Sequence, residues 1–282
     1  MSSHLQTRTL IDALSEVDVL LQGRGTALQA SPQRAALARS FAAKRHPKFF
    51  DAWAFSAAEY ELAVWRVREV APALAAKLEP PTSPGDFTIV GNCALDLRFK
   101  ADPNGANKAH VKLRDGTRAF GAEVKASGAL VYAKRLVALP ATSEGQPVHV
   151  YFYQPNEDPA DTTAAELAAK VFTTLGSPLS AGVTLRFPVA RTSSLPDCGW
   201  VSRLQSACRL YAVGNHVSAG EALVDHNGFF ARETQVVQVA YLSISRPMKT
   251  VVINGPFLVF FADEEGVHAA AWFDWDAFSL MQ

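Results

Sequence analysis

The sequence contains little charge and few cysteines. Only 19% of its 282 residues are charged, and 27 Lys and Arg balance 27 Asp and Glu, so the formal net charge is zero. Without a basic excess or a block of like charges, nucleic acid is not expected as a partner. The three cysteines, Cys93, Cys198 and Cys208, are odd in number and match no metal-ligand spacing. Neither a disulfide framework nor a cysteine metal site is therefore expected.

The chain also lacks segments that would direct it to a membrane. Its first residues, Met1–Gln6, show no basic start followed by an apolar core, so we expect no secretory signal. No apolar run approaches the roughly 20 residues that span a bilayer. These absences favour a protein of the reducing cytoplasm with no membrane partner.

Motifs for catalysis are missing as well. No GxSxG elbow or HxxxH zinc spacing occurs, and Gly23-Arg24-Gly25 is too short for a phosphate loop. Asp274 and Asp276 flank Trp275 and could form an acid/base pair, although carboxylates at a strand end are usually solvated or act as caps. The sequence names no catalytic residue, cofactor or metal, and leaves open whether the protein is an enzyme.

The clearest pattern that is present lies near the C-terminus. The apolar runs Pro256–Phe261 and His268–Phe273 flank the turn residues Asp263–Gly266. Both runs are rich in residues that favour strands. In each run, the residues that would point to one face of a strand are apolar, and so are those that would point to the other face. A strand that is apolar on both faces is typical of a core, so we expect a buried hairpin.

The first third of the chain is dominated by helical patterns. Apolar spacing predicts a helix over Leu5–Leu21 and a second one that begins at Pro32 with Ser31 as its cap. A third helical region is predicted over Phe49–Leu78, with Ser56 and Glu59 forming a capping box.

Aromatic residues gather in this third region. Trp53, Tyr60 and Trp65 could line a pocket, although such sets belong more often to a core. The linker Pro80–Gly85 then ends the helical part.

After this linker the pattern changes to strands. Strands are predicted over Thr88–Phe99, Val111–Thr117, Val131–Pro140, Val148–Pro155 and Val183–Pro188, with a short helix over Thr163–Phe172. The second of these strands runs into an Asp-Gly turn at Asp115-Gly116.

In order and pattern, these segments resemble the serpin family. Serpins carry a hinge of the type VNEEG, then a mobile reactive loop, then a strand of the type RPFLF; here Val224–Gly228 reads VDHNG and Pro256–Phe260 reads PFLVF. Thr88–Phe99 is similar to the serpin strand LVNAIYFKGKW, with Asn92 on the asparagine that helps hold the main sheet where it opens.

This resemblance implies one α+β domain over residues 1–282. N-terminal helices, in a reduced helical part at 1–79, would pack on a large mixed or antiparallel β-sheet. The β-rich part would span 86–282 and end in the buried C-terminal hairpin.

The resemblance also implies a reactive-loop equivalent at 228–247. In an inhibitory serpin a protease cleaves this loop, and the cut loop inserts into the main sheet as a new strand. Insertion favours small side chains, whereas the hinge residues here are Gly228, Phe229, Phe230 and Arg232. We expect Phe229 to overpack the slot and a buried Arg232 or Glu233 to cost several kcal/mol.

The position of the scissile bond would fall near Tyr241, Leu242 and Ser243. The preceding run Val236–Tyr241 nevertheless has the pattern of a fixed strand, which also argues against a mobile loop.

We therefore predict a non-inhibitory serpin-like protein that holds a hydrophobic small molecule or a protein partner in an apolar cleft. The alternative is a cofactor-independent biosynthetic enzyme of the cyclase type, whose aromatic pocket positions a greasy substrate. Inhibition of a serine protease is the third and least favoured possibility.

Overall fold

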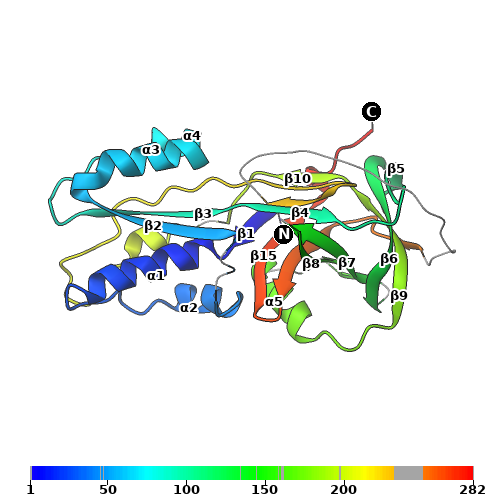
Figure 1. The fold of residues 1–282 in the computed structure, drawn as a ribbon, viewed down its shortest axis with the longest axis horizontal. Helices are drawn as coiled ribbons and strands as arrows, with labels where there is room; N and C mark the ends of the chain where they lie inside the picture. Colours follow the sequence, from blue (N-terminus) through cyan, green and yellow to red (C-terminus); the bar gives the residue numbers. More distant parts are fainter. Residues whose placement is uncertain are drawn as a thin grey trace.

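A large mixed sheet forms most of the molecule, and four of the helices gather at one end of it (Figure 1). The computed structural model describes residues 2–44, 46, 48–133, 135–143, 145–157, 159, 162–196, 198–231 and 250–281. Within them lie five α-helices, most of the strands run antiparallel, and β13 pairs parallel to β9.

The first part of the chain alternates helices with two strands. Its elements are β1 His4–Thr7, α1 Thr9–Gln22, α2 Pro32–Arg39, β2 Phe50–Ser56, α3 Tyr60–Val70 and α4 Pro72–Ala75.

The second part is built almost wholly of strands. Its elements are β3 Phe87–Cys93, β4 Leu95–Phe99, β5 Ala106–Lys112, β6 Arg118–Ala133, β7 Leu136–Ser143, β8 Gln146–Tyr153, α5 Ala164–Thr173, β9 Ser180–Pro188, β10 Ala190–Thr192, β11 Ala222–Val224, β12 Gly228–Ala231, β13 Thr250–Val252, β14 Phe257–Asp263 and β15 Gly266–Phe273.

Local signals placed several of these elements correctly. The hydroxyl of Ser31 accepts from the backbone N–H of Arg34 and starts α2 as predicted. Glu59 accepts from the backbone N–H of Ser56 at 2.9 Å, as a capping box requires. The predicted Asp-Gly turn joins β5 to β6, and Gly116 there has φ +92°, which glycine adopts without strain.

Two expectations for the helical part are wrong. His4–Thr7 is a strand that pairs with β15, so the first helix begins only at Thr9. Phe50–Ser56 is not helical either, because it pairs residue for residue with Phe87–Cys93 of β3. Its aromatic residues favour a strand as readily as a helix, and the partner that decides between them lies more than 30 residues away.

The C-terminal hairpin is the centre of the core, as predicted. β14 pairs with β15 on one side and with β8 on the other. Side chains of alternate parity enter two separate hydrophobic clusters: Phe257, Val259 and Phe261 belong to one, and Leu258 and Phe260 to the other. The hairpin is therefore covered on both faces.

Helices cover both faces of the two-stranded ladder β2–β3. Figure 1 shows α1 and α2 on one side of these strands and α3 and α4 on the other. Among the described residues, no helix has both the length and the apolarity that a membrane crossing requires. This end of the molecule, where helices enclose a narrow part of the sheet, contains the candidate site.

Candidate functional site: an open seam in the sheet

The candidate site begins where the chain leaves the hinge. β12 lies between β11 and β4 and runs antiparallel to both, with Ala231 opposite Ala222 on one side and Leu95 on the other. Gly228–Ala231 thus form an added strand within the sheet, four residues long in the described part of the chain.

This placement corrects the steric expectation for the hinge. Phe229 is 0% exposed, and its cross-strand neighbours are Leu97 and Val224, both aliphatic. The ring does not overpack the sheet because it joins the main hydrophobic cluster below it. At Gly228 a Cβ would lie 2.2 Å from the carbonyl oxygen of Leu97, so the close approach of β12 to β4 requires glycine.

Among the described residues, which end at Ala231 and resume at Thr250, no strand lies between the continuations of the two neighbours of β12. β4 is preceded by β3, and β11 is preceded by residues 216–221. No ladder joins these two segments in the described structure, whereas β2 occupies the other edge of β3. Both segments line the same cavity, which marks a gap between them. We call this gap, between 88–93 and 216–221, the seam.

A cavity of about 240 Å³ occupies the seam and extends under the helices on both faces. Ala231 of β12 is among its lining residues. Aliphatic side chains from β1, α1, α3, α4 and the seam make up most of its wall; they include Leu5, Leu10, Ala13, Val67, Val70, Leu74, Ile89, Val90, Leu195 and Val217. The cavity has the apolar lining that is typical of small-molecule sites.

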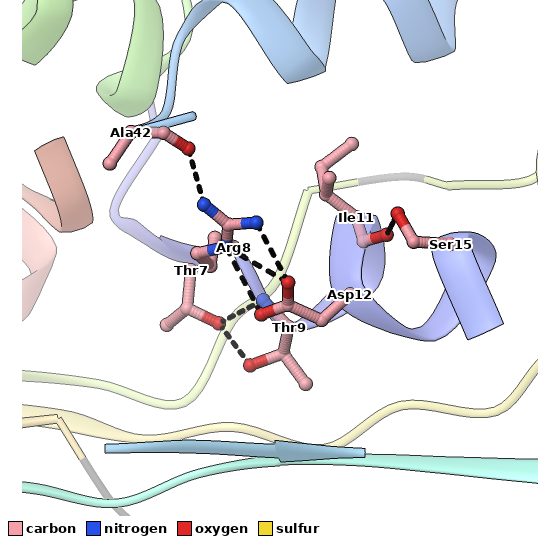
Figure 2. A network of polar contacts seen from close by, with 7 residues as sticks. All are labelled: Thr7, Arg8, Thr9, Ile11, Asp12, Ser15 and Ala42. Atoms are coloured by element: carbon pink, nitrogen blue, oxygen red, sulfur yellow. Dashed lines mark hydrogen bonds and ion pairs between the residues drawn. The ribbon is translucent and has the colours of Figure 1, made fainter. Parts of the chain in front are cut away.

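Polar groups interrupt this wall at few points. Thr7 and Thr9 line the cavity at the start of α1, and their hydroxyl oxygens lie 2.7 Å apart (Figure 2). His216 also lines the cavity, and burial lowers the pKa of its imidazole. Glu221 also lines the cavity, and its carboxylate forms an ion pair with the guanidinium of Arg191 at 2.8 Å.

Asn92, the predicted asparagine of the sheet opening, lies on β3 and lines the cavity. A Cβ on the preceding Gly91 would meet Thr9 and Ala13 of α1. Side chains alternate along a strand, so that of Asn92 points to the opposite face, toward α3. Its Oδ1 is buried and accepts no hydrogen bond from a described residue. Its role in holding the sheet stays a prediction.

The three aromatic residues proposed for a pocket lie outside this cavity. The Trp53 ring stacks under the Arg66 guanidinium at 3.9 Å, and the Tyr60 hydroxyl donates to the carbonyl of Leu78. Trp65 is 53% exposed. The residues Arg232, Tyr241, Leu242 and Ser243 of the expected reactive loop lie outside the described residues.

The paired carboxylates near the C-terminus have structural roles. Asp274 caps a short 3₁₀ turn by accepting from the N–H of Trp275, and Asp276 accepts from the hydroxyl of Ser3. Within the described part of the chain, no group of three or more His, Cys, Asp or Glu side chains could hold a metal ion.

Sequence reasoning missed most of the residues of the cavity. Only Asn92 was singled out from its lining, and for a different reason. The run Ser218-Ala219-Gly220, small residues directly upstream of the hinge, was the available signal that the chain passes close to other elements there.

No protein-family model matches the chain, and no curated protein matches it in sequence. Solved structures match it in fold. The chain aligns with cleaved serpin 42Da over 96% of its own length and 89% of that chain, with a TM-score of 0.53 and 12% identity. It aligns with the Arabidopsis protein AtSerpin1 in its native stressed conformation over 96% of its own length and 91% of that chain, with a TM-score of 0.52 and 12% identity.

Human thyroxine-binding globulin matches over 96% of this chain and 91% of its own, with a TM-score of 0.51 and 8% identity. These likenesses at low identity show the fold alone. The chain has a serpin-like α+β fold, as the resemblance implied.

Proposed function

We propose that this serpin-like chain is a non-inhibitory binding protein that holds a small apolar molecule in the seam cavity. The observation that supports this proposal is the cavity itself, about 240 Å³ of mainly aliphatic lining between 88–93 and 216–221, which no described strand joins. Enclosure between helices and strands removes an apolar ligand from water, which stabilises the complex by about 25 cal/mol for each Å² buried.

The register of β12 argues against filling of the cavity by the chain itself. Phe229 and Ala231 are buried, whereas Phe230 between them is only partly buried. If the strand continued in this register, the side chain of Glu233 would have to enter the same face as Phe229 and Ala231. Burying an unpaired carboxylate costs several kcal/mol, which supports a ligand rather than a longer β12 as the occupant of the seam.

A precedent for small-molecule binding on this fold supports the proposal. Human thyroxine-binding globulin, described in complex with thyroxine, shares the fold with this chain at a TM-score of 0.51. The identity of 8% carries over no binding residue, so the site proposed for this chain depends on its own cavity.

Thermal shift with a neutral apolar probe, N-phenyl-1-naphthylamine, tests the proposal. A ligand that binds only the folded state raises the melting temperature in proportion to ln(1 + [L]/Kd), and the fluorescence of this probe increases in an apolar site. Ala71→Leu places a larger side chain in the cavity wall and should weaken binding at least tenfold. Ala73→Leu is the matched control, because Ala73 is exposed and does not line the cavity.

A second variant guards against misfolding of the first. Leu74→Phe adds bulk to the same wall and should weaken probe binding in the same direction. Equal affinity in the wild type, Ala71→Leu and Leu74→Phe, with circular dichroism confirming the fold, would show that the probe binds elsewhere.

Trapping of a protease is the second candidate, and the position of β12 favours it. The start of the expected reactive loop lies within the sheet, between β11 and β4, and the seam continues ahead of it. Incubation with chymotrypsin-like proteases decides between the candidates. An SDS-stable complex, or a large rise in melting temperature after cleavage within 232–249, would support trapping and overturn the non-inhibitory proposal.

A further inference from the structure

We infer that the seam cavity selects uncharged ligands with one hydroxyl or carbonyl group and excludes organic anions. This inference rests on the proposed function and names the chemical class of the ligand. It follows from the side chains that line the cavity and from the directions of the charged groups near it.

No lysine or arginine is among the described residues that line the cavity. An anion bound there would lose its hydration without gaining a cationic partner, which strongly disfavours binding. The one carboxylate in the wall, Glu221, would add repulsion. The cation nearest to that carboxylate, Arg191, already pairs with it, and the side chains of both remain substantially exposed to solvent.

Arg8 lies in the sequence between Thr7 and Thr9, which line the cavity, but its side chain is directed away from the cavity. Its guanidinium is buried, pairs with Asp12 at 2.9 Å, and donates to the backbone carbonyl of Ala42. Figure 2 shows the guanidinium on the side of Ala42, with the hydroxyls of Thr7 and Thr9 on the other side of the backbone. Arg8 therefore cannot neutralise a ligand in the seam without breaking a buried ion pair.

His216 supplies no positive charge near neutral pH, because burial lowers the pKa of its imidazole. The neutral ring keeps one N–H donor and one acceptor nitrogen. His216 therefore suits an uncharged polar group better than an anion.

The hydroxyl pair of Thr7 and Thr9 can hold one neutral polar group. One hydroxyl proton serves the contact between the two oxygens, and Thr7 Oγ1 also accepts from the backbone N–H of Thr9 at 3.2 Å. In the described hydrogen bonds the second hydroxyl proton is not used, so it can be donated to a ligand oxygen. A ligand hydroxyl or carbonyl at this point would be satisfied without a charge.

The volume sets the size of the ligand. An engineered apolar cavity of about 150 Å³ binds benzene. The seam cavity, at about 240 Å³, is large enough for a molecule of two fused rings. A neutral bicyclic alcohol or ketone therefore combines the size, apolarity and single polar group that the site accommodates.

Three probes of one ring system test this inference at pH 7.5: naphthalene, neutral 2-naphthol and anionic 2-naphthoate. We expect 2-naphthol to bind tightest, naphthalene several-fold more weakly, and 2-naphthoate at least tenfold more weakly than 2-naphthol. Thr9→Val keeps the shape of the side chain and removes the hydroxyl. It should lower the affinity for 2-naphthol about three- to tenfold and leave naphthalene unchanged, whereas Thr9→Ser should restore the wild-type order.

The outcomes separate this inference from the proposed function. If 2-naphthoate binds as tightly as 2-naphthol, and Ala71→Leu weakens both, the cavity binds ligands but the inference about charge is wrong. If Thr9→Val weakens naphthalene and 2-naphthol equally, the hydroxyl pair does not hold the polar group. If none of the three probes binds and N-phenyl-1-naphthylamine also fails, the proposed function itself is refuted. Ser218→Arg, which places a cation on the seam, should raise the affinity for 2-naphthoate relative to 2-naphthol.

Discussion

A Phe229→Ala substitution measures how firmly the start of the expected reactive loop is held in the sheet. The phenyl ring is 0% exposed and lies between the cross-strand neighbours Leu97 and Val224. Truncation of a buried phenylalanine to alanine costs about 3–5 kcal/mol, through lost burial and the cavity that remains. For a chain of this size the melting temperature should fall by roughly 5–9 °C.

Urea unfolding followed by tryptophan fluorescence is the assay, with Phe230→Ala as the matched control. Phe230 belongs to the same strand and loses the same atoms, but its ring is only partly buried. The control should therefore lose about 1–2 kcal/mol. Equal losses in the two variants, or a loss below about 1 kcal/mol for Phe229→Ala, would refute the insertion of β12, because an uninserted strand buries neither ring.

Three further predictions concern the sheet, a buried charge and pH. Gly228→Ala would bring a Cβ against a carbonyl oxygen of β4 and should lower the free energy of unfolding, measured in urea, by about 1–3 kcal/mol. Gly214→Ala is the control, because a Cβ there meets nothing within 4 Å, and it should change this free energy little. Asp12→Ala leaves the buried guanidinium of Arg8 without its carboxylate and should lower the free energy of unfolding by about 3–5 kcal/mol. Replacing both partners by apolar residues should recover most of this loss. Additive effects of the two substitutions in a double-mutant cycle would contradict this prediction. Burial lowers the pKa of several histidines, including His268, so the unfolded chain takes up protons first as the pH falls below about 6.5. The melting temperature should therefore be constant above neutral pH and decline toward pH 5. His268→Gln should flatten this decline. A melting temperature that rises on acidification would contradict the lowered histidine pKa values of the folded state.

The elements that sequence reasoning placed correctly depend on residues close together in the chain. Ser31 and Arg34 form the cap of α2 within one helical turn, and Gly116 permits the turn between β5 and β6. The C-terminal hairpin joins strands through the short turn that follows Asp263, and its double-sided apolar pattern identified it as core. In each case the information lies within a few residues, where backbone conformation and burial pattern are decided locally.

The two failures in the helical part involve partners that are distant in the chain. β1 forms a strand because it meets β15, more than 260 residues later, and β2 forms one because it meets β3. Local propensity cannot distinguish a helix from a strand when both fit, so the pairing partner decides.

The site shows this limit most clearly. The sequence by itself determined that the chain would fold with a serpin-like order of elements and that the hinge would carry two phenylalanines. Only the tertiary structure decided that Phe229 enters the core and that, among the described residues, no strand joins 88–93 to 216–221. A cavity is the space left between elements, and its walls here come from residues 5 to 231. No local pattern encodes such a space, because it depends on how far apart the packed elements come to lie.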